Sequence, residues 1–216
     1  MSPSRSRRRR SPKKKSNNKK WILISVLVIV VLIAGFFLLV SNNPSEDLPT
    51  NNKIRLQTSM GDIIIELRDD MPITTTNFKK LVQQGVYDGT IFHRVIAGFM
   101  IQGGNPDTGP WSGGSIQNIE DEISDNAENR KNVRGTISMA KQSGPDGMVI
   151  PDSANSQFFI NVVDNSGQQF DDTYPVFGEV IEGMIVADDI SNVQTSGSPL
   201  DKPIEDVVLI KATFVD

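Results

Sequence analysis

The chain has 216 residues, of which 38% are apolar, and its formal net charge is −4 at neutral pH. It contains no cysteine, which excludes disulfides, thiolate metal sites and a cysteine nucleophile. The charge is unevenly divided: residues 1–20 hold ten basic and no acidic residues, so the rest of the chain is strongly acidic. A basic arm is therefore joined to an acidic body.

Residues 21–40 form an apolar run that only Ser25 and Gly35 interrupt. As a helix, about 20 such residues span about 30 Å, the thickness of the hydrocarbon core of a membrane. The run is longer than the apolar part of a signal peptide, and no small-residue cleavage site follows it. We therefore expect an uncleaved transmembrane anchor. Because the basic residues precede it, the positive-inside rule predicts a cytoplasmic N-terminus and an extracytoplasmic body.

The basic arm, residues 1–20, contains Ser-Arg dipeptides that would also suit nucleic-acid binding. Its place beside an apolar span favours a topology determinant held near anionic lipid headgroups. We therefore expect a membrane contact through residues 21–40 and no nucleic-acid partner.

Residues 41–52 are rich in Asn, Ser and Pro and are predicted to be a linker before a body that begins at residue 53. A helix is expected over residues 72–84, since Pro72 suits a first helical turn and Gly85 a helix stop. Alternating or short apolar runs between turn residues predict an antiparallel barrel or sandwich with one or two helices over its open ends. The expected strands are 53–58, 63–67, 91–95, 99–102, 136–139, 157–162, 176–181 and 207–214, with a second helix at 184–191.

The common catalytic arrangements are missing from the sequence. His93 is the only histidine, and no Gly-x-Ser-x-Gly elbow or phosphate-binding loop is present. We interpret His93 as a hydrogen-bonded strand residue. The acidic cluster at residues 120–125 lacks the spacing of a calcium loop and is expected to be solvated. We therefore expect neither a metal nor a cofactor.

Arg94 stands out because it lies in a strand-like run otherwise dominated by apolar residues. Strand alternation places Arg94 and Val95 on opposite faces of a sheet. The arginine could then reach over an apolar hollow completed by Gln102 and Gln157, which is the general form of a ligand or peptide site. A surface arginine lying over a sheet is an equally good interpretation of the residues alone.

The segment 92–104, with Phe-His-Arg-Val-Ile, Gly-Phe-Met and Gln-Gly-Gly, resembles the signature of cyclophilin-type peptidyl-prolyl isomerases. Arg-Gly-Thr-Ile-Ser-Met-Ala at 134–140 and Ser-Gln-Phe-Phe-Ile at 156–160 resemble later strands of the same family. The resemblance covers residues 53–216. It implies a mainly β fold, a closed eight-stranded antiparallel barrel capped by two helices, here preceded by one transmembrane helix, as in a membrane-anchored prokaryotic form.

The resemblance also implies the site. Arg94 matches the catalytic arginine, and Lys141 replaces a frequent asparagine, which would add positive charge at the rim of the groove. Trp111 falls near a usual glycine position and is expected at the outer pocket, and the loop 143–153 is longer than in compact members. The residues that match substrate-binding positions are Phe99, Met100, Gln102, Ala140, Lys141, Gln157, Phe159, Phe170 and Tyr174.

These features predict a monomeric peptidyl-prolyl cis–trans isomerase that assists the folding of extracytoplasmic proteins. Rotation about an X–Pro bond changes no covalent bond, so neither a nucleophile nor an acid–base pair is needed. The expected partners are proline-containing polypeptides, and the expected location is the cell membrane. The alternative is a non-catalytic module that binds proline-containing peptides on the same scaffold.

Overall fold

The structure is a computed structural model and describes residues 48–216. The predicted basic arm and anchor, and the predicted linker as far as residue 47, lie outside the described residues. Within residues 48–216, no helix is both long enough and apolar enough to cross a membrane. Pro49 and Asn52, in the predicted linker, already contact the body, because the Lys79 ammonium donates hydrogen bonds to the Pro49 carbonyl and the Asn52 side chain.

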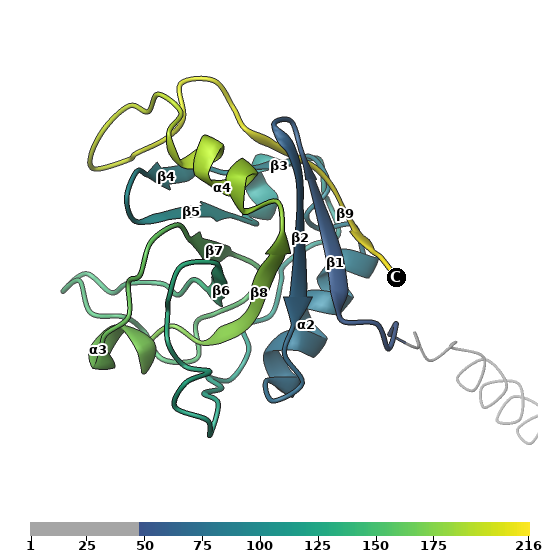
Figure 1. The fold of residues 1–216 in the computed structure, drawn as a ribbon, viewed down its shortest axis with the longest axis vertical. Coiled ribbons are helices and arrows are strands. Elements are labelled where there is room, and N and C mark those ends of the chain that lie inside the picture. Colours follow the sequence, from purple (N-terminus) through teal and green to yellow (C-terminus); the bar gives the residue numbers. More distant parts are fainter. Residues whose placement is uncertain (1–47) are drawn as a thin grey trace, which may run out of the picture. The chain divides into compact units, whose positions relative to one another are not determined.

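The described chain is mainly β, with a few short helices (Figure 1). Most elements begin and end within two residues of the predicted bounds, because the periodicity of apolar residues and the turn residues are local signals. The elements are β1 (Lys53–Thr58), β2 (Gly61–Leu67), α2 (Pro72–Gln83), β3 (Thr90–Ile91), β4 (Arg94–Ile96), β5 (Met100–Gly103), the 3-10 helix η1 (Pro106–Thr108), β6 (Thr136–Met139), β7 (Phe158–Asn161), α3 (Gln168–Asp171), β8 (Val176–Glu182), α4 (Met184–Ser191) and β9 (Val208–Phe214).

The strands form one antiparallel sheet in the order β3-β9-β1-β2-β8-β6-β7-β5-β4, and the sheet is curled (Figure 1). This curled nine-stranded sheet corrects the closed eight-stranded barrel implied by the resemblance. The run 91–95, expected as one strand, is divided between two partners: Thr90 and Ile91 pair with β9, whereas β4 pairs with β5. Only Phe92 and His93 separate these two end strands in the chain.

The inner face of the sheet and the helices enclose a single apolar core. α2 contributes Phe78, which is fully buried, and its ring lies 4.8 Å from that of Tyr87 and 5.1 Å from that of Phe177. α4 contributes Ala187 and Ile190, which are also fully buried. Burial of the apolar side chains of this core supplies most of the free energy that favours the folded chain.

The N-terminus of α2 is capped by a residue distant in sequence. Met71 occupies the cap position and provides no side-chain hydrogen bond. The Glu122 carboxylate accepts hydrogen bonds from the amides of Ile73 and Thr74, at 3.0 and 2.8 Å. These amides have no partner inside the helix, and the positive end of the helix dipole favours a carboxylate there. The expectation that the acidic cluster is merely solvated is therefore wrong for Glu122.

Candidate active site

Arg94 belongs to a row of side chains that crosses three strands. Arg94 in β4 lies opposite Gln102 in β5, and Gln102 lies opposite Phe159 in β7. Cross-strand partners share one face of a sheet. The next row, which contains Val95 and Ile101, is buried in the core. The predicted alternation between Arg94 and Val95 is confirmed, and the Arg94 row lies on the face away from the core.

Aromatic side chains from the loops and from α3 close over this row. The ring of Phe170, in α3, lies 6.0 Å from the ring of Phe99 and 6.0 Å from the ring of Phe159. The ring of Tyr174, just after α3, lies 4.7 Å from Phe170 and 5.6 Å from Phe159. Most of these rings meet edge to face, a favourable arrangement for aromatic pairs. Together with Met100, which is 2% exposed, they form an apolar wall.

Phe99 is held in place by the turn between β4 and β5. Its amide donates to the Ile96 carbonyl at 3.1 Å, and its carbonyl accepts from the Asn165 side chain at 2.8 Å. Gly98 has a φ of 69°, a conformation that a residue with a Cβ rarely adopts. This turn therefore fixes the backbone from which the Phe99 side chain extends.

The wall and the Arg94 row enclose a hollow of about 400 Å³. A second, smaller hollow of about 190 Å³ adjoins it, and Ala140 and Lys141 line both. Gln157, predicted for the same site, lines the smaller hollow. The first hollow brings together the other nine predicted residues and one that the prediction lacked, Ser143; its lining is Arg94, Phe99, Met100, Gln102, Ala140, Lys141, Ser143, Phe159, Phe170 and Tyr174.

Gln102, a member of the Arg94 row, is linked to Gln157 and, through it, to a histidine. The Gln102 amide donates a hydrogen bond of 3.0 Å to the Gln157 side-chain oxygen. Gln157 in turn interacts with the His93 ring. Burial lowers the pKa of His93 below its usual value, and the nearby Arg94 charge acts in the same direction. His93 Nδ1 is buried without a hydrogen-bond partner among the described residues, so the ring is best accommodated as neutral imidazole.

Lys141 does not add a free positive charge to the rim of the groove, which corrects the expectation. Its side chain is only 4% exposed, and its ammonium lies 2.7 Å from Asp121 Oδ2. The Asp121 side chain is 26% exposed. A buried ammonium needs such a partner because leaving water is costly for an unpaired charge. Asp121 therefore neutralises Lys141 between the two hollows.

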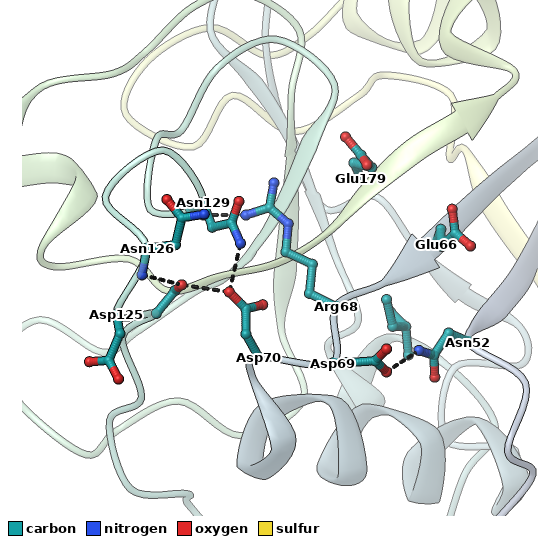
Figure 2. A pocket seen from close by; sticks show the side chains of 11 residues that line it. Asn52, Glu66, Arg68, Asp69, Asp70, Asp125, Asn126, Asn129 and Glu179 are labelled. Atoms are coloured by element: carbon teal, nitrogen blue, oxygen red, sulfur yellow. Dashed lines mark hydrogen bonds between the residues drawn. The ribbon is translucent and has the colours of Figure 1, made fainter.

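The larger hollow shown in Figure 2, about 980 Å³, is a different kind of surface. Carboxylates dominate its lining, and its polar side chains bond one another: Asp70 Oδ2 accepts from Ser124 at 2.6 Å and from Asn129 at 2.7 Å. These hydrogen bonds lower the pKa of Asp70. They tie the loop that contains Ser124 to the turn before α2. This hollow has no apolar wall. The Arg94 hollow, although less than half as large, is therefore the better peptide site.

Sequence reasoning missed or misplaced three residues near the site. Ser143 carries no distinctive signal, because a serine in a loop is common. His93 was interpreted as a hydrogen-bonded strand residue, but it lies between β3 and β4, outside both strands, and its Nδ1 has no hydrogen-bond partner among the described residues. Trp111 is absent from the lining of both hollows and packs against the core instead of shaping the outer pocket. Only the position of His93 beside Arg94 in the signature could have indicated a role near the site.

The Arg94 hollow sets a guanidinium beside an aromatic wall, an arrangement suited to an apolar ring next to a polar group. A family model described as cyclophilin type peptidyl-prolyl cis-trans isomerase/CLD matches residues 53–214. The chain therefore belongs to the cyclophilin family, and it is a peptidyl-prolyl cis–trans isomerase.

Individual relatives cover most of the body. A peptidyl-prolyl cis-trans isomerase of Acinetobacter baylyi is 45% identical over 150 residues, which are 68% of this chain and 75% of that protein. Peptidyl-prolyl cis-trans isomerase B of Escherichia coli is 41% identical over 169 residues, 74% of this chain and 98% of that protein. A crystal structure of a cyclophilin type isomerase from Cryptosporidium parvum, 30% identical, matches with a TM-score of 0.64 over 76% of this chain and 98% of its own.

Proposed function

We propose that Arg94 accelerates X–Pro isomerisation by stabilising the amide while it is twisted. The observation that carries this proposal is that Arg94 lines the same hollow as Phe99 and Phe159, on the outer face of the sheet. The guanidinium remains charged at all ordinary pH values and directs its donors in a rigid fork. It is therefore suited to a reaction that needs a fixed hydrogen-bond donor and no proton transfer.

The planar amide resists rotation with a barrier of roughly 18–20 kcal/mol because rotation breaks its resonance. In the twisted state, the prolyl nitrogen recovers its lone pair and becomes a hydrogen-bond acceptor. A donor aimed at this nitrogen binds the twisted amide better than the planar one, and each preference of about 1.4 kcal/mol accelerates rotation about tenfold. Arg94 supplies that donor.

The apolar wall contributes by holding the proline ring while the rest of the peptide rotates. Phe99, Met100, Phe159 and Phe170 line the hollow. They also displace water. Because water stabilises the charge-separated planar amide, its removal favours the twisted state. Gln102, bonded to Gln157, is placed to orient the substrate backbone beside Arg94.

The test is an isomerisation assay with Arg94→Ala and Arg94→Lys. Loss of one preorganised donor typically costs roughly 100- to 1,000-fold in rate. We expect Arg94→Ala to lower kcat/KM about 100-fold and Arg94→Lys to fall between it and the wild type, because lysine keeps the charge without the fork. Peptide binding should weaken far less. Full activity in Arg94→Ala would contradict the mechanism, and tight binding without turnover by the wild type would indicate a binding module.

We further propose that this activity serves proteins that fold outside the cytoplasm, with the monomeric domain tethered by residues 21–40. The supporting features are the apolar run and the ten basic residues that precede it. Protease added to intact cells should digest residues 48–216 and spare an N-terminal tag. Protection of the domain until lysis would refute this topology.

A further inference from the structure

A short hairpin projects from the loop between β6 and β7, beside the Arg94 hollow. Ser143 and Val149 face each other across it, and the Gly144 amide donates to the Met148 carbonyl at 2.8 Å. The Ile150 amide donates to the Gln142 carbonyl at 2.9 Å. This pattern makes Ser143 and Val149 a non-hydrogen-bonded pair, whose side chains lie close together on one face of the hairpin.

The other face of this hairpin, 142–150, carries two exposed apolar side chains. Alternation places Met148 and Ile150 there, with Met148 across from Gly144 and Ile150 across from Gln142. Because Gly144 has no side chain to cover its neighbour, Met148 remains 69% exposed, and Ile150 is 42% exposed. Two exposed apolar side chains next to each other on a hairpin suggest a contact surface rather than a scattered surface residue.

The base of the hairpin is continuous with both hollows of the site. Ser143 lines the Arg94 hollow, and Gln142 lines the adjoining smaller hollow. Ser153 closes the base, because its hydroxyl accepts from the Gln142 amide at 3.0 Å and donates to the Ile150 carbonyl at 2.6 Å. The base is therefore fixed to the site, and the apolar face continues from the side of the smaller hollow.

The segment next to the base is also held to the rest of the body. Asp152 Oδ1 accepts from the Asp121 amide at 2.7 Å, and the Ala154 carbonyl accepts from the Ile119 amide at 2.8 Å. Asp121 is the residue that neutralises Lys141. The Lys141 ammonium is therefore paired where it lies near the hairpin. An apolar side chain could approach the hairpin without exposing an unpaired buried charge.

We propose that Met148 and Ile150 form a specificity-determining surface that binds an apolar side chain of the substrate, two to three residues from the proline. The inference rests on the proposed use of the Arg94 hollow for the proline ring. Two to three residues of extended peptide span roughly 7–10 Å. The smaller hollow adjoins the Arg94 hollow through Ala140 and Lys141 and reaches the hairpin base at Gln142, so a peptide that leads from the Arg94 hollow to the hairpin would cross it. The preferred substrates are extended segments with an apolar residue two to three residues from the proline, on the side of the proline that faces the hairpin.

The experiment measures isomerisation by the full-length chain, solubilised in detergent, with short single-proline peptides. Each peptide carries Leu or Gly at one position, two or three residues before or after the proline. The double variant Met148→Ser/Ile150→Ser removes the apolar face. Ile185→Ser is the matched control, because Ile185 is 72% exposed and lies in α4, outside the lining of both hollows.

We expect the wild type and Ile185→Ser to prefer Leu over Gly at one of these positions by roughly three- to tenfold in kcat/KM, the effect of partly covering apolar surface. In the double variant this preference should fall to about one, while the rate with the Gly peptides stays unchanged. An unchanged preference would overturn the proposal. An equal rate change for every peptide would also overturn it and indicate that the hairpin controls access to the site.

Two further readouts separate other outcomes. Absence of turnover with every peptide by the wild type would refute the proposed use of the Arg94 hollow, not the role of Met148. Self-association that disappears in the double variant, without any change in peptide preference, would show that a second copy of the chain occupies the surface and would overturn the proposal. Thermal unfolding of each variant should match the wild type, because Met148 and Ile150 are exposed.

Discussion

The ion pair between Lys141 and Asp121 makes a quantitative prediction about stability. The Lys141 side chain is 4% exposed, and Asp121 Oδ2 lies 2.7 Å from its ammonium. Asp121→Asn removes the negative charge with little change in shape, and the ammonium is left buried and unpaired. Breaking one side of a buried pair typically costs roughly 3–5 kcal/mol. Since 26% of the Asp121 side chain is exposed, water can enter, and we expect about 2–3 kcal/mol.

The assay is thermal unfolding of residues 48–216, which contain the whole described core, followed by circular dichroism. For a domain of this size, about 1 kcal/mol shifts Tm by roughly 3 °C, so Asp121→Asn should lower Tm by about 6–9 °C. Adding Lys141→Met should recover most of this loss, because the second change removes the unpaired charge. The control is Asp62→Asn, which breaks the exposed pair of Asp62 with Arg55 at 3.5 Å and should cost less than about 1 kcal/mol.

The reasoning fails if Asp121→Asn and Asp62→Asn lower Tm equally, because the Lys141 ammonium would then have reached water. It also fails if the double variant is no more stable than Asp121→Asn alone. In the second case, the loss would come from the Asp121 carboxylate itself. Loss of a hydrogen bond to Asp121 Oδ1 would not explain it, since Oδ1 is buried and accepts no hydrogen bond from the described residues.

Three further predictions concern the cap of α2, the half-buried His93 and the aromatic wall. Glu122→Gln should destabilise the domain by about 1 kcal/mol in urea unfolding, because it weakens the cap, whereas exposed Glu120→Gln should have no effect. Since the folded-state pKa of His93 is lowered, the unfolded chain binds more protons, and the free energy of unfolding should fall as pH drops below about 6.5. His93→Gln should remove that part of the pH dependence and leave the losses near pH 4 that come from carboxylates. Phe170→Ala should lower kcat/KM about tenfold by opening the wall, with Phe170→Leu retaining most activity; equal activities would show that the proline ring does not contact this residue.

Local structure could be predicted from the sequence because its causes lie within a few residues. The predicted bounds 136–139 and 184–191 coincide with β6 and α4, and the predicted helix from Pro72 ends one residue beyond α2. The prediction of one strand over residues 91–95 was wrong because the choice of strand partner is not local. Its first residues continue alongside β9, and its last residues pair with β5.

Most of the site residues could be named from the resemblance, but their arrangement could not. Gln102 and Phe159 lie 57 positions apart in the sequence, and only the register of β5 and β7 makes them neighbours. Ser143 was missed because loop position alone brings it to the hollow. The prediction that Lys141 adds a free positive charge at the groove was wrong because its partner, Asp121, lies 20 positions earlier in a loop.

The sequence by itself determined which faces of the strands are apolar, where the turns fall and which conventional catalytic groups are missing, since these depend on residue type and spacing. It also determined that Arg94 and Val95 face opposite ways, because the side-chain period of a strand is two. The tertiary structure alone decided which strands are neighbours, which carboxylate neutralises Lys141 and which side chains remain uncovered beside the groove. Those outcomes depend on contacts between distant segments, whose free energies are settled only when the sheet curls and the core closes.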